Sequence, residues 1–271
     1  MTLPWVGVIL LRVHVLSGAA KLGHGFQYGV AQSDLFLAHV TFTDMIIGNG
    51  LLAKAFAPRF TNDPTVIVFA SGVSNSRETR TDQFERERQL LDSALASGQR
   101  LVYFSTCSVH DPELVRSPYV QHKVAMEQLV LADATQNMVF RLPQVVGHCT
   151  NQHTLTNYLH HQISTGQPFQ IWRNAKRNLI DVSDLANVAT HLVASHQANG
   201  TISNIACPFS VSVLELVQIF EDLLHKPANY CAVEAGGGYD IETRQAQIIA
   251  TQLGITFDST YVRKLIGKYY A

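Results

Sequence analysis

Hydrophobic positions from residue 45 onward alternate between short continuous runs and helical patterns. Four apolar, β-branched runs have the length of buried strands: "MII" at 45–47, "TVIVFA" at 65–70, "RLVYFS" at 100–105 and "MVFRL" at 138–142. The stretches between them predict helices over 51–57, 83–97 and 118–134. Because strands that alternate with helices form parallel sheets, we expect an α/β fold with helices on both faces of the sheet.

The helix predicted over 83–97 has its apolar positions at helical spacing, at Leu90, Leu91, Ala94 and Leu95. Gly98 follows as a natural C-terminal stop. The mixed charges of residues 77–88 are interpreted as the solvated face of this helix.

The second half of the chain is more irregular and suits a small C-terminal substrate lobe. A helix is expected at about 152–165, a hairpin in "PFQIWRNAKRNLIDV" and a strand in "TISNIA". Further helices are expected near 183, over 213–225, near 243–253 and near 260–269, with Asp184 as a helix cap. We therefore divide the chain into a dinucleotide-binding core at 45–150 and a mostly substrate-binding lobe at 151–271. Some helices or strands of 151–271 are also expected to belong to the core.

Residues 1–44 differ from the rest, with only four charged side chains, Arg12, Lys21, Asp34 and Asp44. Arg12 interrupts the apolar stretch and no basic segment precedes it, so we do not expect a signal peptide. We interpret 1–44 as an N-terminal extension outside the functional domain. The alternative is that "VGVILLRVHVL" forms a strand of the sheet.

Composition narrows the classes of function. The 271 residues are 46% apolar and 15% charged, which allows a large core, and no apolar run reaches membrane-spanning length. A formal net charge of −1 gives no reason to expect nucleic acid as a partner. The four cysteines lack metal-site spacing and suit a reducing, cytoplasmic compartment, and we expect no metal.

A glycine-rich loop follows the first predicted strand. Gly48, Gly50 and Ala53 form a G-x-G-x-x-A pattern that leads into a helix through Leu51. Gly48 permits a tight turn, Gly50 lets a diphosphate approach the backbone, and the helix N-terminus supplies N–H groups. The pattern predicts a phosphate-binding loop, although an ordinary strand–helix turn has the same glycines.

A Tyr–Lys pair follows the third predicted strand. Ser117 and Pro118 are typical of a helix start, so Tyr119 and Lys123 lie one turn apart on one face. A free tyrosine ionises near pH 10, and a neighbouring ammonium and a helix N-terminus lower that pKa. We therefore expect Tyr119 to be a general acid or base, with Thr106 orienting the reacting oxygen. The alternative is two ordinary helix residues.

Taken in order, these segments resemble the extended short-chain dehydrogenases, and within them the NAD-dependent nucleotide-sugar epimerases and dehydratases. The resemblance is carried by these segments: "MIIGNGLLAKAF", "LVYFSTCSVHD", "SPYVQHK", "FRLPQVVG", "RNLIDVSDLANVATHLV" and "YDIETRQAQIIATQLGI". It implies a Rossmann-like fold, NAD or NADP as cofactor and a nucleotide-linked sugar as substrate.

The resemblance also implies roles for single residues. Thr106, Tyr119 and Lys123 would be catalytic, and Lys123 would also bind the nicotinamide ribose. Leu142, Pro143 and Ser71 would lie at the cofactor. Gln144 and Arg177 would contact the substrate diphosphate.

The chain departs from the family in its first half. Between the first helix and the strand at 65–70, the segment "AFAPRFTNDPTVIVFA" leaves no room for the usual second strand and its ribose-binding Asp. Asp63 lies beside a proline and is interpreted as a turn residue. We expect a shortened fold with a reduced adenosine pocket.

Two functions follow from these observations. The first is an NAD(P)-dependent oxidoreductase or epimerase that acts on a nucleotide-linked sugar for surface polysaccharide. An epimerase and a ketoreductase both remain open. The second is a non-catalytic binding or scaffold subunit. Relatives often form homodimers through a helix pair, which here would be 83–97 and 118–134.

Overall fold

The computed structural model describes residues 45–132, 136–149, 151–152 and 154–271. The extension predicted at 1–44, and the alternative strand within it, lie outside the described residues.

The main sheet has five parallel strands in the order β1-β2-β3-β4-β9. The strands are β1 (Ile46–Ile47), β2 (Val66–Phe69), β3 (Arg100–Thr106), β4 (Met138–Leu142) and β9 (Thr201–Asn204). β2, β3 and most of β4 are buried, as their continuous apolar runs predict. The expectation of a parallel α/β sheet is confirmed. Among the described residues β1 is an edge strand, as a shortened first half would leave it.

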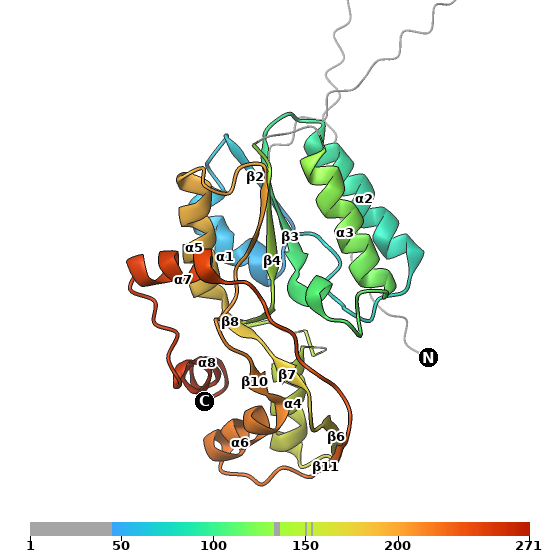
Figure 1. The fold of residues 1–271 in the computed structure, drawn as a ribbon, viewed down its shortest axis with the longest axis vertical. Coiled ribbons are helices and arrows are strands. Elements are labelled where there is room, and N and C mark those ends of the chain that lie inside the picture. Colours follow the sequence, from blue (N-terminus) through green and yellow to red (C-terminus); the bar gives the residue numbers. More distant parts are fainter. Residues whose placement is uncertain (1–44, 133–135, 150, 153) are drawn as a thin grey trace, which may run out of the picture. The chain divides into compact units, whose positions relative to one another are not determined.

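Helices cover both faces of this sheet (Figure 1). On one face lie α1 (Leu51–Phe60), α5 (Val182–Ala194) and α7 (Arg244–Gln252), which pack against Val68, Val102 and Phe140. On the other face lie α2 (Thr81–Leu95) and α3 (Pro118–Leu131), which pack against Ile67, Phe69, Leu101 and Val139. Because successive side chains of a strand point to opposite faces, the buried strands contribute side chains to two apolar cores, one on each face of the sheet.

Two helix ends follow their local sequence. α3 begins where Ser117 accepts a hydrogen bond from the backbone N–H of Val120 (3.2 Å) and Pro118 occupies the first helical position. After α2 the chain turns at Gly98, whose φ of +71° is readily adopted only by glycine.

A third apolar core lies apart from the two faces of the main sheet. It is built from α4 (Leu155–Thr165), α6 (Val213–Leu224) and α8 (Tyr261–Tyr270), with Leu159, Phe220 and Leu265 among its buried side chains. β9, α5 and α7 belong to the main sheet and its cover, so the second half of the chain contributes both to this third core and to the core on one face of the main sheet.

The hairpin predicted at 168–182 is wrong. That segment holds β6 (Phe169–Trp172), β7 (Lys176–Arg177) and β8 (Leu179–Asp181), and none of them pairs with another. β6 pairs in parallel with β11 (Tyr230–Val233), β7 antiparallel with β10 (Val211–Ser212), and β8 in parallel with β5 (Gln144–Val146). Local alternation identified strands here, but their partners come from distant segments.

The cap of α5 also differs from the prediction. Asp181 is the capping residue, and its carboxylate accepts a hydrogen bond from the Ser183 N–H (2.7 Å). Asp184 lies in the first turn instead and accepts a hydrogen bond from the Tyr261 hydroxyl (2.8 Å).

Candidate functional site

Several predicted site residues meet at one edge of the main sheet. Because β1 to β4 are parallel, their carboxyl ends share an edge, and in register Thr106 of β3 lies beside Leu142 of β4. Gly48 follows β1 and Ser71 closely follows β2 at the same edge. This is where open α/β sheets bind their ligands.

The glycine loop has the geometry that a diphosphate needs. Gly48 has a φ of +129°, and a Cβ there would lie 2.5 Å from the carbonyl oxygen of Ala70, so only glycine fits. Gly50 is the residue before α1, and a Cβ there would meet nothing within 4 Å. No side chain caps this helix end, which leaves its first N–H groups facing the open space in front of Gly50.

The other residues predicted at the cofactor lie at the start of α1 and just after β2. Ala53 is buried, as close packing of helix and strand requires. Leu51, at the start of α1, approaches Gly147, where a Cβ would lie 2.8 Å from Leu51 Cδ1. Ser71 is held by Arg86 of α2, whose guanidinium donates to the Ser71 hydroxyl (3.2 Å) and carbonyl (3.0 Å).

Thr106 and Tyr119 are brought together. Thr106 ends β3, is buried, and accepts a hydrogen bond from the N–H of Ser108 in the short helix η1 (Cys107–His110) at 3.1 Å. Tyr119 lies in the first turn of α3, and its phenol is close enough to the Thr106 side chain for the two to interact. The two hydroxyls can therefore bind one reacting oxygen and pass a proton.

The expected acidity of Tyr119 is not produced by the protein's own groups. Burial raises the pKa of Tyr119 to about 12, although the Thr106 side chain opposes the rise. The negative charge of Glu87 contributes to this rise. The prediction that Lys123 lowers this pKa is therefore corrected: the phenol stays protonated near neutral pH.

Lys123 is buried, and its ammonium is fully occupied. It donates to Oε1 of Glu87 (2.9 Å), to the hydroxyl of Tyr103 (3.1 Å) and to the carbonyl of Phe104 (3.3 Å). An ammonium has three N–H donors, so none is left for a nicotinamide ribose in this arrangement. The ribose contact of Lys123 stays a prediction.

Glu87 is a site residue that the sequence interpretation missed. Its charge was assigned to the solvated face of α2, but the side chain is 0% exposed. Burial raises the pKa of Glu87, but the Lys123 ammonium, the nearby His122 and the hydrogen bonds from Tyr103 and the Val73 N–H outweigh it, and the net shift is downward. The signal was present: Glu87, Leu91 and Ala94 share one helix face.

Leu142 and Pro143 lie at the carboxyl end of β4, Leu142 buried and Pro143 half-buried. Gln144 begins β5, and its Oε1 is buried with no hydrogen-bond partner among the described residues. Arg177, in β7, is half-buried and donates to the carbonyl of Lys176 (2.7 Å). The cofactor and substrate contacts predicted for these four residues stay predictions.

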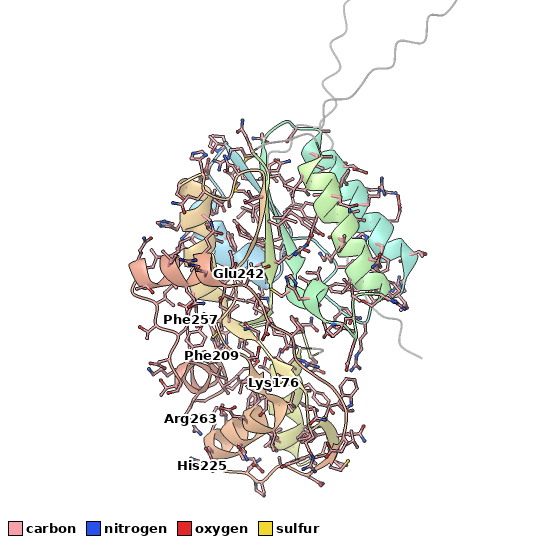
Figure 2. The ribbon with its side chains drawn as sticks, in the orientation of Figure 1. Lys176, Phe209, His225, Glu242, Phe257 and Arg263 are labelled. Carbon is pink, nitrogen blue, oxygen red and sulfur yellow. The ribbon has the colours of Figure 1, made fainter. Side chains whose placement is uncertain are left out.

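A cavity of about 470 Å³ opens beside this edge. It is lined mainly by Lys176, Asn178, Phe209, Ser210, Tyr239 and Asp240; Figure 2 labels Lys176 and Phe209. Tyr239 lines the cavity and also lies close enough to the side chains of Ser108 and Tyr119 to interact with them, so it connects the cavity to Thr106 and Tyr119. Tyr239 was not singled out from the sequence, since no local pattern links it to β3.

Comparisons with solved structures show the same fold. MoeE5 in complex with UDP-glucuronic acid and NAD is 23% identical, with 76% of this chain and 78% of that chain covered and a TM-score of 0.63. RMD from Pseudomonas aeruginosa complexed with NADPH is 17% identical, covers 81% and 85%, and has a TM-score of 0.62. The UDP-glucose 4-epimerase of Thermus thermophilus in complex with NAD is 13% identical, covers 82% and 83%, and has a TM-score of 0.60.

A search of curated proteins gave no match. In the described part of the chain, no helix has the length and apolar character needed to cross a bilayer. The sequence model of the NAD dependent epimerase/dehydratase family matches residues 37–206, more than half of the chain. Together with the parallel sheet and the glycine loop, this match shows that the chain belongs to the NAD dependent epimerase/dehydratase family.

Proposed function

We propose that the protein is an NAD(P)-dependent oxidoreductase or epimerase that acts on a nucleotide-linked sugar, in the cytoplasm and in the synthesis of surface polysaccharide. The observation that carries this proposal is that Thr106, at the carboxyl end of β3, and Tyr119, in the first turn of α3, lie close enough for their side chains to interact. Two hydroxyls at this place can hold a carbinol or carbonyl oxygen and exchange a proton with it.

The glycine loop supports a dinucleotide as cofactor. The open space at Gly50 and the uncapped N-terminus of α1 fit the diphosphate, and Leu142 and Pro143 would flank the nicotinamide. When bound, the nicotinamide would supply hydride chemistry at the carbon that carries the reacting oxygen. The solved relatives with NAD or NADPH support this choice.

The cavity beside Tyr239 supports a substrate larger than a free sugar. Its volume of about 470 Å³ is within the range of small-molecule sites. Lys176 lines it, and Arg177 lies close enough to Tyr239 to lower the pKa of that phenol, although burial raises it overall. Two cationic side chains beside a polar cavity suit a diphosphate. MoeE5, of the same fold, was solved with UDP-glucuronic acid.

The catalytic roles follow from the geometry. Tyr119 exchanges the proton with the substrate oxygen, and Thr106 orients that oxygen and interacts with the phenol. Lys123 has a structural role: its hydrogen bonds to Glu87 of α2 and to the carbonyl of Phe104 in β3 hold α3, which carries Tyr119, in place.

A second candidate is a non-catalytic binding subunit. The observation that favours it is the ammonium of Lys123, which has no N–H left for a ribose. The edge position of β1 among the described residues adds to it, because no neighbouring strand there supplies an adenosine pocket.

One experiment separates the two candidates. The purified protein is titrated with NAD, NADH, NADP and NADPH by calorimetry, and then assayed with UDP-glucose and UDP-glucuronic acid as probes. The enzyme proposal expects saturable dinucleotide binding and a turnover that Tyr119→Phe lowers by about 10² or more while the fold is kept. Tyr158→Phe, at an exposed tyrosine, is the control. Unchanged turnover in Tyr119→Phe would exclude the mechanism, and no dinucleotide binding would favour the binding subunit.

A further inference from the structure

Arg86 of α2 brings a positive charge beside the glycine loop. Its guanidinium donates to the Ser71 hydroxyl (3.2 Å) and to the Ser71 carbonyl (3.0 Å), at the carboxyl end of β2. The glycine loop approaches the same residue, because a Cβ at Gly48 would lie 3.1 Å from the Ser71 backbone nitrogen. Ser71 therefore lies between the guanidinium and the loop that follows β1.

The charge of Arg86 is not paired within the protein. In the part of the chain that the structure describes, no carboxylate forms an ion pair with this guanidinium, whereas Arg88 of the same helix pairs with Asp92 (3.7 Å). A guanidinium has five N–H donors, and the contacts with Ser71 use two of them. The side chain is half-buried, so it is held in place while donors remain for a ligand.

The edge around the glycine loop supplies no carboxylate for an adenosine ribose. Residues 48–51 and 70–76 contain no Asp or Glu. Asp63 lies before β2, toward the opposite edge, and its carboxylate accepts hydrogen bonds from Thr65 (2.9 and 2.6 Å). Glu87 is buried and binds Lys123 (2.9 Å). Because β1 is an edge strand among the described residues, no neighbouring strand adds a ribose-binding carboxylate either.

A phosphate fits what this edge does offer. The glycine loop and the N-terminus of α1 provide neutral backbone N–H groups, and residues 48–51 and 70–76 contain no Lys or Arg. Arg86 reaches this place from α2, on the other face of the sheet from α1. The planar fork of a guanidinium binds phosphate oxygens through charge-assisted hydrogen bonds, which are stronger than those from neutral donors.

We propose that Arg86 binds a phosphate group of the dinucleotide, and that this contact supplies affinity that the reduced adenosine pocket lacks. This inference rests on the proposed function and adds one residue to its cofactor site. The diphosphate is common to NAD and NADP. NADP also carries a 2′-phosphate, which offers the same chemistry to a guanidinium, and a comparison of the two dinucleotides distinguishes the groups.

The test is a calorimetric titration of wild type, Arg86→Gln and Arg86→Lys with NAD and NADP. We expect the Kd of Arg86→Gln to rise about tenfold or more, as for a lost charge-assisted hydrogen bond. A rise for both dinucleotides identifies the diphosphate as the group bound, and a rise for NADP alone identifies the 2′-phosphate. Arg86→Lys keeps the charge and should lose less affinity. Arg88→Gln is the control: it removes the same charge from an exposed position of α2, and its Kd should stay that of the wild type.

An unchanged Kd in Arg86→Gln, or an equal rise in Arg88→Gln, would overturn the proposal. If Arg86→Gln does not fold, the wild type is labelled with 15N-arginine and the Arg86 guanidinium signal is assigned with Arg86→Lys. That signal should shift when a dinucleotide is added to saturation, and no shift would overturn the proposal.

Failure of the wild type to bind either dinucleotide would overturn the proposed function instead. Inorganic pyrophosphate then serves as the probe for Arg86. Binding that Arg86→Gln weakens and Arg88→Gln does not would support the phosphate contact, and any other result would overturn it.

Discussion

Lys123 Nζ lies 2.9 Å from Oε1 of Glu87, and the two side chains join α3 to α2 with exposed fractions of only 3% and 0%. Both helices cover the same face of the sheet, so this ion pair lies between them and the strands they cover. A buried ion pair is costly to desolvate. Removing one partner lowers the free energy of unfolding strongly, because the other charge is then buried without compensation.

We expect Lys123→Met to lower the free energy of unfolding by about 3–5 kcal/mol, because it leaves the carboxylate of Glu87 buried without its cation. The double variant Lys123→Met/Glu87→Gln should lose clearly less than the sum of the two single variants. Urea unfolding measures the free energy of unfolding of Lys123→Met, of Glu87→Gln and of the double variant. Arg263→Ala is the control, because its pair with Asp222 is more than half exposed and should be worth less than about 1 kcal/mol. Additive losses would contradict this prediction.

Gly72→Ala tests the space around the same pair. A Cβ would lie 2.6 Å from Lys123 Nζ and 2.9 Å from Glu87 Oε1, and neither atom can move without losing hydrogen bonds. We expect a loss of about 1–3 kcal/mol in urea unfolding. Gly267→Ala, inside α8 with nothing within 4 Å of the new Cβ, should instead be neutral or stabilise by up to about 1 kcal/mol. Equal effects of the two substitutions would exclude the packing argument.

Stability should also depend on pH through Glu87. Its pKa is lowered in the folded protein: burial alone raises it, but Lys123 and the hydrogen bonds outweigh burial. A depressed carboxyl pKa contributes stability above its unfolded value, near 4.3, and that stability is lost as the pH falls below it. We expect the melting temperature of the wild type to fall more steeply between pH 5 and pH 3 than that of Glu87→Gln. Parallel curves for the two proteins would contradict this assignment.

The sequence predicted most of the sheet and its helices because periodicity is a local property. It also predicted that Thr106 and Tyr119 meet, since the end of a buried strand and the first turn of the next helix lie at the same edge. It did not predict the partner of β6, because Phe169 pairs with Tyr230 from a distant segment. It assigned Glu87 to solvent because an isolated glutamate is seldom buried, and only Lys123 and Tyr103 make that burial favourable.

Gly50→Ala tests the phosphate loop separately from the fold. A Cβ at Gly50 meets no protein atom within 4 Å, so the substitution should change the free energy of unfolding by no more than about 1 kcal/mol. The same Cβ would occupy the space in front of the N-terminus of α1, where a diphosphate must approach the backbone N–H groups. We expect the Kd for the preferred dinucleotide to rise about tenfold or more, which corresponds to about 1.4 kcal/mol. Calorimetric titration measures this, with Gly267→Ala as the control that should bind as the wild type does. Equal affinity of Gly50→Ala and wild type would place the dinucleotide elsewhere, because a ligand that lies on this loop cannot share the volume of the added methyl group.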